Sequence, residues 1–184
     1  MDKFKRYFFF FITFCFCGYI WEVFYTYMRK GVVINMGTLK GPWLPIYGAG
    51  GLIIYFIYKK IKSNALGLFL ISSISAAIIE YATSYYLEMV YHMKWWDYSK
   101  KPFNLNGRIW LYGVLFFGVF ALICIKIIIP LLDKLYDKVE GKGMSIVLYT
   151  LLALFTIDFV CSTISPNTDD AKKVALAVVD FNSY

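Results

Sequence analysis

The sequence has few of the residues that build metal sites, disulfide frameworks or charged soluble surfaces. It contains one histidine, His92, and only 17% of its residues are charged, where a soluble domain has about 25%. All four cysteines lie inside apolar runs; they are Cys15, Cys17, Cys124 and Cys161. A zinc site would pair cysteine with histidine at ligand spacing, and disulfides would lie in loops. We therefore expect free, packed thiols, no metal and no cofactor.

Long apolar runs dominate the chain, which is 60% hydrophobic. A membrane helix needs about 20 mostly apolar residues, and a soluble core could not bury this many uninterrupted ones. We predict an all-α fold: one integral membrane domain over 1–184, a polytopic helical bundle with about five spans. The expected spans are 7–28, 43–58, 65–90, 109–129 and 144–164, followed by a polar tail over 165–184.

Basic residues stand at the ends of the apolar runs, where they meet lipid headgroups. The net charge of +7 therefore indicates a lipid bilayer as partner, and no nucleic-acid-binding motif is present. With five spans, nine basic residues fall on each side, so the count alone does not set the orientation. The compact basic clusters at 3–6 and 59–62 abut helix ends, as the clusters that keep a loop on the cytoplasmic side do. We expect a multi-pass protein of the cell membrane with a cytoplasmic N-terminus and an external C-terminus.

The second run opens with GPWLPIYGAGG, residues 41–51. Proline removes backbone donors and glycine loosens a helix. Irregular backbone at membrane depth persists where it is buried in protein or lines a wet cavity. The segment is thus a re-entrant stretch, a helix that starts late, or an ordinary interfacial turn. Farther on, Pro130 is expected to end or kink the fourth span, the charged segment 133–143 to form a solvated turn, and 171–181 is compatible with a short surface helix.

Four carboxylates interrupt the apolar runs. They are Glu22, Glu80, Glu88 and Asp158. An ionisable group at the bilayer centre costs at least about 2.5–3.5 kcal/mol, so it normally faces a cavity or a partner. Glu80, Ser84 and Glu88 recur every four residues and share one helix face. Solvation of Glu88 near the interface, and a simple inter-helix hydrogen bond from Asp158, remain as alternatives.

A comparable stripe on the first span contains Gly18, Glu22 and Thr26. A small residue such as Gly18 permits close helix approach in membranes. We expect this stripe to face the Glu80 stripe across the bundle.

Residues 95–108, WWDYSKKPFNLNGR, form a dense polar and aromatic loop between two apolar runs. These residue types hold a shape and make directed hydrogen bonds, which predicts a built site at one face of the membrane. Asp97 and Arg108 are the natural charge partners of Glu22 and Glu80, because arginine can bridge carboxylates in a bidentate way.

Plainer interpretations of this loop stand beside the site. Trp95, Trp96 and Tyr98 are also what an interfacial aromatic belt contains. His92 fits a structural or exposed role, and Ser99 has no adjacent base that would make it a nucleophile.

The chain resembles the CmpB-like family of small bacterial membrane proteins called type IV ABC transporters. The resemblance rests on the GYIWE pattern at 18–22, the long Asn-Gly-Pro motif of 35–50, the glutamates of the third span, and the 96–109 loop. The motif residues are Asn35, Gly41, Pro42, Pro45, Tyr47, Gly48, Trp96, Tyr98, Ser99, Asn104, Asn106 and Gly107. It implies a permease-like component, and because no Gly-rich Walker loop is present, any ATPase is a separate subunit.

Three functions are open at this point. A transport component would bind an unidentified solute through Glu22, Glu80 and Arg108, and five spans would call for a homo-oligomer or a partner. A membrane-embedded enzyme could use the same groups for acid-base chemistry on a lipid or lipid-linked substrate. A scaffold would use the charges only to lock the bundle. We rank transport first and expect no enzymatic activity of the chain itself.

Overall fold

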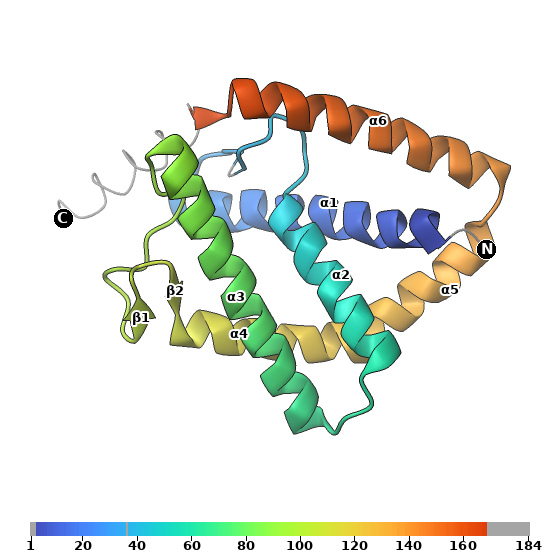
Figure 1. The fold of residues 1–184 in the computed structure, drawn as a ribbon, viewed down its shortest axis with the longest axis horizontal. Coiled ribbons are helices and arrows are strands. Elements are labelled where there is room, and N and C mark those ends of the chain that lie inside the picture. The colour runs from blue at the N-terminus through green and yellow to red at the C-terminus, as the bar shows by residue number, and fades with distance from the viewer. Residues whose placement is uncertain (1–2, 36, 169–184) are drawn as a thin grey trace. The chain divides into compact units, whose positions relative to one another are not determined.

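The structure, a computed structural model, describes residues 3–35 and 37–168 and is almost entirely helical (Figure 1). The helices are α1 (Lys3–Lys30), α2 (Pro45–Lys60), α3 (Ala65–Tyr91), α4 (Leu111–Ile123), the π-helical turn η1 (Cys124–Ile128), α5 (Ile129–Val139) and α6 (Lys142–Ile164). Two short strands, β1 (Asn104–Leu105) and β2 (Ile109–Trp110), form an antiparallel hairpin. The predicted all-α fold is confirmed. The segment 171–181 lies outside the described residues.

The chain forms two compact units, which we describe separately. The first contains Met1–Gly48 and Glu140–Tyr184, and the second contains Ala49–Val139.

Within the described residues, four helices are long and apolar enough to cross a membrane. They are Lys3–Met28, Ala65–Tyr91, Leu111–Val139 and Lys142–Ile164. Between α1 and α3, the second apolar run is a helix that starts late, at Pro45, where the missing backbone N–H costs little. Its 16 residues give a length of about 24 Å, against a hydrocarbon core of about 30 Å.

Helices α1 and α6 run parallel within the first unit. Near their starts, Lys5 Nζ donates to Ser145 Oγ at 3.1 Å, and farther along the rings of Phe11 and Phe155 lie 5.5 Å apart. Figure 1 shows both helices beginning at the same end. Parallel spans require an odd number of crossings between them. The helices α3 and α4–α5 supply two candidate crossings, and a further crossing by α2 stays a prediction.

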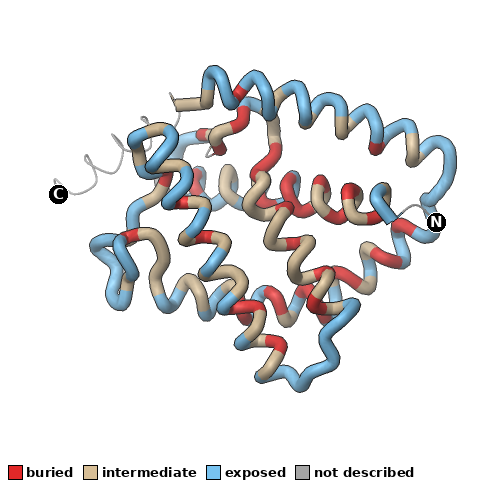
Figure 2. Tube along the Cα trace, viewed as in Figure 1, coloured by how far each residue is buried: buried red, intermediate tan, exposed pale blue. Residues whose placement is uncertain are grey.

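Large apolar side chains are exposed along α6, which Figure 2 shows as mostly exposed. They include Ile146, Val147, Leu154, Ile157, Val160 and Ile164. Apolar surface left in water costs about 25 cal/mol per Å², whereas lipid tails remove that cost. This exposure supports a membrane location.

In the second unit, α3 and α4 pack closely because glycine removes a side chain at the contact. A Cβ added to Gly118 would come within 2.8 Å of the Phe69 ring of α3. At the other end of the pair, Lys59 of α2 donates to the buried carboxylate of Asp133 in α5.

The prediction of a turn at 133–143 is wrong except at residues 140–141, because α5 continues to Val139 and α6 begins at Lys142. The helix continues past Pro130 to Val139, and Asp133 and Tyr136 are buried. The backbone N–H of Ile129 bonds to Cys124 O, five residues back, so the π-helical turn shifts the ladder just before the proline. This shift lets the helix accept a residue that has no N–H and that crowds the preceding turn.

The cysteines of the described residues are free thiols, as predicted. Only Cys15 and Cys124 are packed in the interior, whereas Cys17 and Cys161 are exposed on the helix surface. The prediction that all four are packed is therefore wrong for two of them.

Candidate functional site

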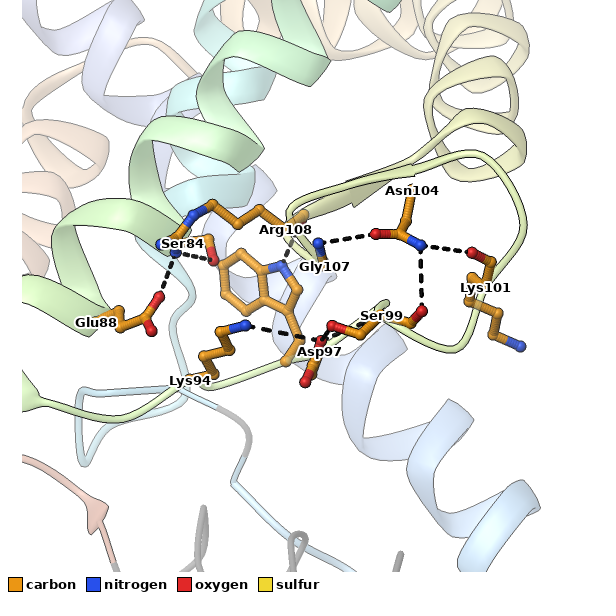
Figure 3. A network of polar contacts seen from close by, with 10 residues as sticks. Ser84, Glu88, Lys94, Asp97, Ser99, Lys101, Asn104, Gly107 and Arg108 are labelled. Atoms are coloured by element: carbon orange, nitrogen blue, oxygen red, sulfur yellow. Dashed lines mark hydrogen bonds and ion pairs between the residues drawn. The ribbon is translucent and has the colours of Figure 1, made fainter.

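Arg108 joins the Trp95–Arg108 loop to the polar face of α3 (Figure 3). Its Nη1 lies 2.6 Å from Glu88 Oε2 and donates weakly to Ser84 Oγ at 3.4 Å. The guanidinium also lies over the rings of Tyr81 and Tyr85, with its Cζ 5.7 and 5.3 Å from the centroids. The side chain is 13% exposed. The pairing and the cation–π contacts offset the cost of burying this charge.

Two helical turns earlier on α3, Glu80 receives a second contact from the same loop. Tyr98 Oη donates to Glu80 Oε1 at 3.0 Å, and Glu80 is buried. The stripe predicted from the four-residue spacing of Glu80, Ser84 and Glu88 thus meets the loop at each of its positions. We call Arg108, Glu88, Ser84, Glu80 and Tyr98 the Arg108 cluster.

The loop folds on itself through Asp97 and Asn104. Asp97 Oδ1 accepts the Ser99 N–H at 2.9 Å and the Ser99 hydroxyl at 2.5 Å. These bonds, led by the hydroxyl and helped by Lys94 at 4.0 Å, lower the pKa of Asp97. Asn104 Nδ2 donates to the carbonyls of Ser99 and Lys101, at 3.2 and 2.8 Å. Ser99 is therefore a turn residue here, and its hydroxyl is committed to a carboxylate.

The hairpin turn is set by Asn106 and Gly107. Both have positive φ, 54° and 68°, and Arg108 N bonds to Leu105 O at 3.0 Å. Asparagine followed by glycine is the preferred pair for a type I′ turn, which needs positive φ twice. Trp96 Nε1 donates to Arg108 O at 3.0 Å, so the turn and an indole together hold the arginine backbone.

A second polar cluster lies in the first unit and centres on Asp158 of α6. Its carboxylate accepts the backbone N–H groups of Lys40 and Gly41, at 3.2 and 2.9 Å, and the indole N–H of Trp43 at 2.7 Å. Ser162 Oγ adds a fourth bond at 3.1 Å. The carboxylate thus fastens the glycine- and proline-rich segment ahead of α2 to the last span.

Glu22 of α1 pairs with the first turn of α2. Tyr47 Oη donates to Glu22 Oε1 at 2.5 Å, and Gly18 of α1 lies against the Tyr47 ring. Gly48 is equally close to α1, where an added Cβ would meet the Phe11 ring at 2.7 Å. The close approach predicted for Gly18 is observed, with the start of α2 as the neighbour. Pro42 and Pro45 frame this segment, and Pro45 begins the helix.

Asn35 shapes the loop between α1 and α2. Its Nδ2 donates to Leu39 O at 3.0 Å, and its Oδ1 accepts the Gly37 N–H at 3.1 Å. Asn167, beyond α6, donates from its backbone N–H to Thr38 O at 3.0 Å. The motif asparagine therefore organises the loop internally.

The structure places the predicted site residues in two groups. Glu88 and Arg108 meet in the second unit, where Glu80 and Asp97 also lie, and Glu22 and Asp158 belong to the first. Arg108 pairs with Glu88, and Asp97 bonds within its own loop. Contact of Glu22 with Asp97 or Arg108 remains a prediction.

Several partners were missed from the sequence. Trp43 holds Asp158, Tyr47 holds Glu22, and Tyr81 and Tyr85 flank Arg108. The sequence did offer one indication. Tyr81 and Tyr85 lie close to the carboxylates of α3 in sequence, and Trp43 and Tyr47 lie in the glycine- and proline-rich segment. That signal does not specify the partner.

Among residues 3–35 and 37–168, no group of three or more histidine, cysteine, aspartate or glutamate side chains is arranged to hold a metal ion. The Arg108 cluster offers a cation, two carboxylates and hydroxyl groups, which suit binding of a polar group. No curated protein sequence and no solved structure matches the chain. The resemblance seen in the motifs is confirmed by the sequence model of one family, which matches residues 9–163. The chain belongs to the family described as putative ABC-transporter type IV.

Proposed function

We propose that the chain is a permease-like membrane component of a transport system, and that the Arg108 cluster is its polar site for a solute. The observation that carries this proposal is the state of Arg108. Its side chain is 13% exposed and paired with Glu88, yet its buried Nε donates a hydrogen bond to no described residue. A buried donor without an acceptor costs about 1–3 kcal/mol. A bound solute with an acceptor atom would remove that cost.

The surroundings of Arg108 favour solute binding over a scaffold role in which its charge only holds the helices together. Glu88 is 35% exposed, so part of its side chain reaches the surface, while the Oε2 that faces Arg108 is buried. The carboxylates of Glu80 and Glu88 share one face of α3. Arg108 reaches this face from the loop. Ionisable groups in membrane segments commonly mark substrate or ion pathways.

The late start of α2 supports transport in a second way. Transporter sites often use interrupted helices, whose freed backbone groups lie near the site. Here the segment before α2 is held by Asp158 and its first turn by Glu22. We propose that these two carboxylates hold the interrupted start of α2 in place.

A separate ATPase subunit, together with one or more copies of the chain, completes the assembly in this proposal. With the N-terminus in the cytoplasm, the cytoplasmic connections are residues 61–64 and 140–141. Because these connections are short, an ATPase subunit on that side would have to contact helix ends. Fusing a phosphatase reporter to the C-terminus checks the orientation: activity is expected, and a stable but inactive fusion overturns it.

The experiment that tests the transport role is co-purification from native cells. The full chain carries an affinity tag, is extracted in mild detergent, and the eluate is examined for a nucleotide-binding subunit and for ATP hydrolysis. We expect both. An eluate with the chain alone, in one or several copies and without ATP hydrolysis, overturns the proposal.

A further inference from the structure

An apolar groove lies between α3 and the β1–β2 hairpin in the second unit. Its lining residues are Ala77, Ile78, Tyr81, Ala82, Leu105 and Ile109, and its volume is about 330 Å³. Two alanines form its floor on α3, and Ile78 and Leu105 are exposed beside it. The volume lies at the lower end of the range for ligand sites, about 300–1,000 Å³.

The groove lies beside the Arg108 cluster. Tyr81 connects the two, since it lines the groove and its ring centroid lies 5.7 Å from Arg108 Cζ. The Tyr81 hydroxyl accepts a hydrogen bond from Asn106 Nδ2 at 2.8 Å, which fixes the ring against the hairpin. From Ile78 to Glu88, α3 rises by about 15 Å. The α3 residues of the groove are therefore followed along the same helix by Ser84 and Glu88, the partners of Arg108.

Along α3, the apolar groove comes before the contacts of Arg108, just as the acyl chains of a lipid lie deeper in the bilayer than its charged headgroup. α3 starts at residue 65 on one side of the membrane and ends at 91, next to the polar loop. The groove is thus deeper in the bilayer than Arg108, which lies toward the headgroups. Residues 94–108 have a net charge of +3, from Lys94, Lys100, Lys101 and Arg108 against Asp97, and this charge falls to +1 when Glu80 and Glu88 of α3 are counted.

We propose that the groove and Arg108 together bind one anionic phospholipid, with an acyl chain in the groove and the phosphate at Arg108. The inference rests on the proposed function, because it names the ligand class of the Arg108 cluster. Guanidinium groups match phosphate oxygens in geometry, and the Arg108 Nε is the donor that this phosphate would satisfy. An anionic lipid is favoured over a zwitterionic one by the charge of the loop.

The test uses the purified full chain in nanodiscs made of equal amounts of phosphatidylglycerol and phosphatidylcholine. Lipids that stay bound after transfer to detergent are counted by native mass spectrometry. Ala82→Phe fills the groove, and Arg108→Gln removes the cation. Ala153→Phe is the matched control, because Ala153 is exposed on α6. We expect the unmodified chain and the control to retain one phosphatidylglycerol, and the two site variants to retain about tenfold less.

Three results would overturn the inference. They are equal retention of both lipids by the unmodified chain, unchanged phosphatidylglycerol retention in both site variants, and equal loss in the Ala153→Phe control. Variants that fail to elute as the unmodified protein does are replaced by Ala82→Leu and Arg108→Lys, for which a smaller loss in the same direction is expected.

ATP hydrolysis by the co-purified complex separates this inference from the transport role. If Arg108→Gln lowers hydrolysis but keeps the lipid, the lipid inference fails and the transport site stands. If both site variants lose the lipid and hydrolysis is unchanged, the lipid site stands and the transport role of Arg108 fails.

Discussion

Arg108 Nη1 lies 2.6 Å from Glu88 Oε2, so the end of the loop is fixed to the last turns of α3. The Asn106–Gly107 turn and the Trp96 indole hold the arginine backbone from the other side. A loop that has its own turn, indole bond and ion pair is more than a connection between two spans. It positions a cation on a face of α3 that carries two carboxylates.

Breaking the Arg108–Glu88 pair should destabilise the second unit. We expect Arg108→Ala to lower the free energy of unfolding by about 1–3 kcal/mol, because the remaining carboxylate loses its partner and the loop its attachment. Glu88→Gln should cost less, since Glu88 is partly exposed. Denaturant unfolding in detergent measures both. In the double variant the losses should be less than additive, by about 0.5–2 kcal/mol; strictly additive losses would show that the pair contributes nothing.

Asp158 should control the attachment of the segment ahead of α2. Asp158→Asn keeps the shape of the side chain but replaces an acceptor oxygen by an amide. At least one of the donors at Lys40, Gly41 and Trp43 then loses its acceptor, a cost of about 1–3 kcal/mol. Limited proteolysis should cut residues 37–44 faster in this variant. Trp43→Phe removes a single donor and should have a smaller effect; equal cleavage of all three proteins would contradict the role given to Asp158.

The contact of Gly18 with Tyr47 should not tolerate a methyl group. In Gly18→Ala the new Cβ would come within 2.6 Å of Tyr47 Cβ, so the start of α2 must shift. We expect a loss of about 1–3 kcal/mol, as for other overpacked sites. Gly50→Ala is the matched control in α2, because nothing lies within 4 Å of its added Cβ. It should be neutral or stabilising. Equal free energies of unfolding for the two variants would contradict the close contact of Gly18 with Tyr47.

Asp97 should give the loop a pH dependence. Its pKa in the folded loop is lowered by the Ser99 bonds, so its contribution to stability is present above the ordinary value, about 3.9, and is lost as pH falls through the lower folded value. Asp97→Asn should therefore be less stable than the unmodified chain at pH 7, and the difference should shrink once the pH falls below about 4. Tryptophan fluorescence during thermal unfolding, at pH 7 and at a pH below about 4, measures the stability difference between the two proteins. A gap of the same size at both would mean that the charge of Asp97 does not act in the loop.

The helices follow from the sequence because long apolar runs leave few alternatives in a membrane. The fold departs from expectation after Pro130, where the helix continues beyond the π-helical turn to Val139 and the buried positions Ile129, Asp133 and Tyr136 keep helical spacing. A proline alone does not reveal whether the preceding turn can shift its hydrogen bonds. The segment was therefore predicted as a turn, although its buried face indicated a helix.

The polar residues of the site were identified from their types and positions, but their partners were not. The four-residue spacing placed Glu80 and Glu88 on one face, two turns or about 12 Å apart. Whether Arg108 pairs with Glu80 or with Glu88 depends on the direction in which the Asn106–Gly107 turn orients the arginine. Likewise, Trp43 and Asp158 are 115 positions apart in the sequence, and no local pattern links them.

ATP hydrolysis by the complex co-purified from native cells tests most directly whether the Arg108 cluster serves transport. Four forms of the chain are compared at equal amounts in nanodiscs: unmodified, Arg108→Ala, Glu80→Gln and Gly50→Ala. The unmodified and Gly50→Ala complexes should hydrolyse ATP equally. Arg108→Ala and Glu80→Gln should each fall at least about tenfold, because each removes a charged group worth roughly 1.5–3 kcal/mol in a hydrogen bond. Equal turnover by all four forms, or an eluate without an ATPase, would contradict the account.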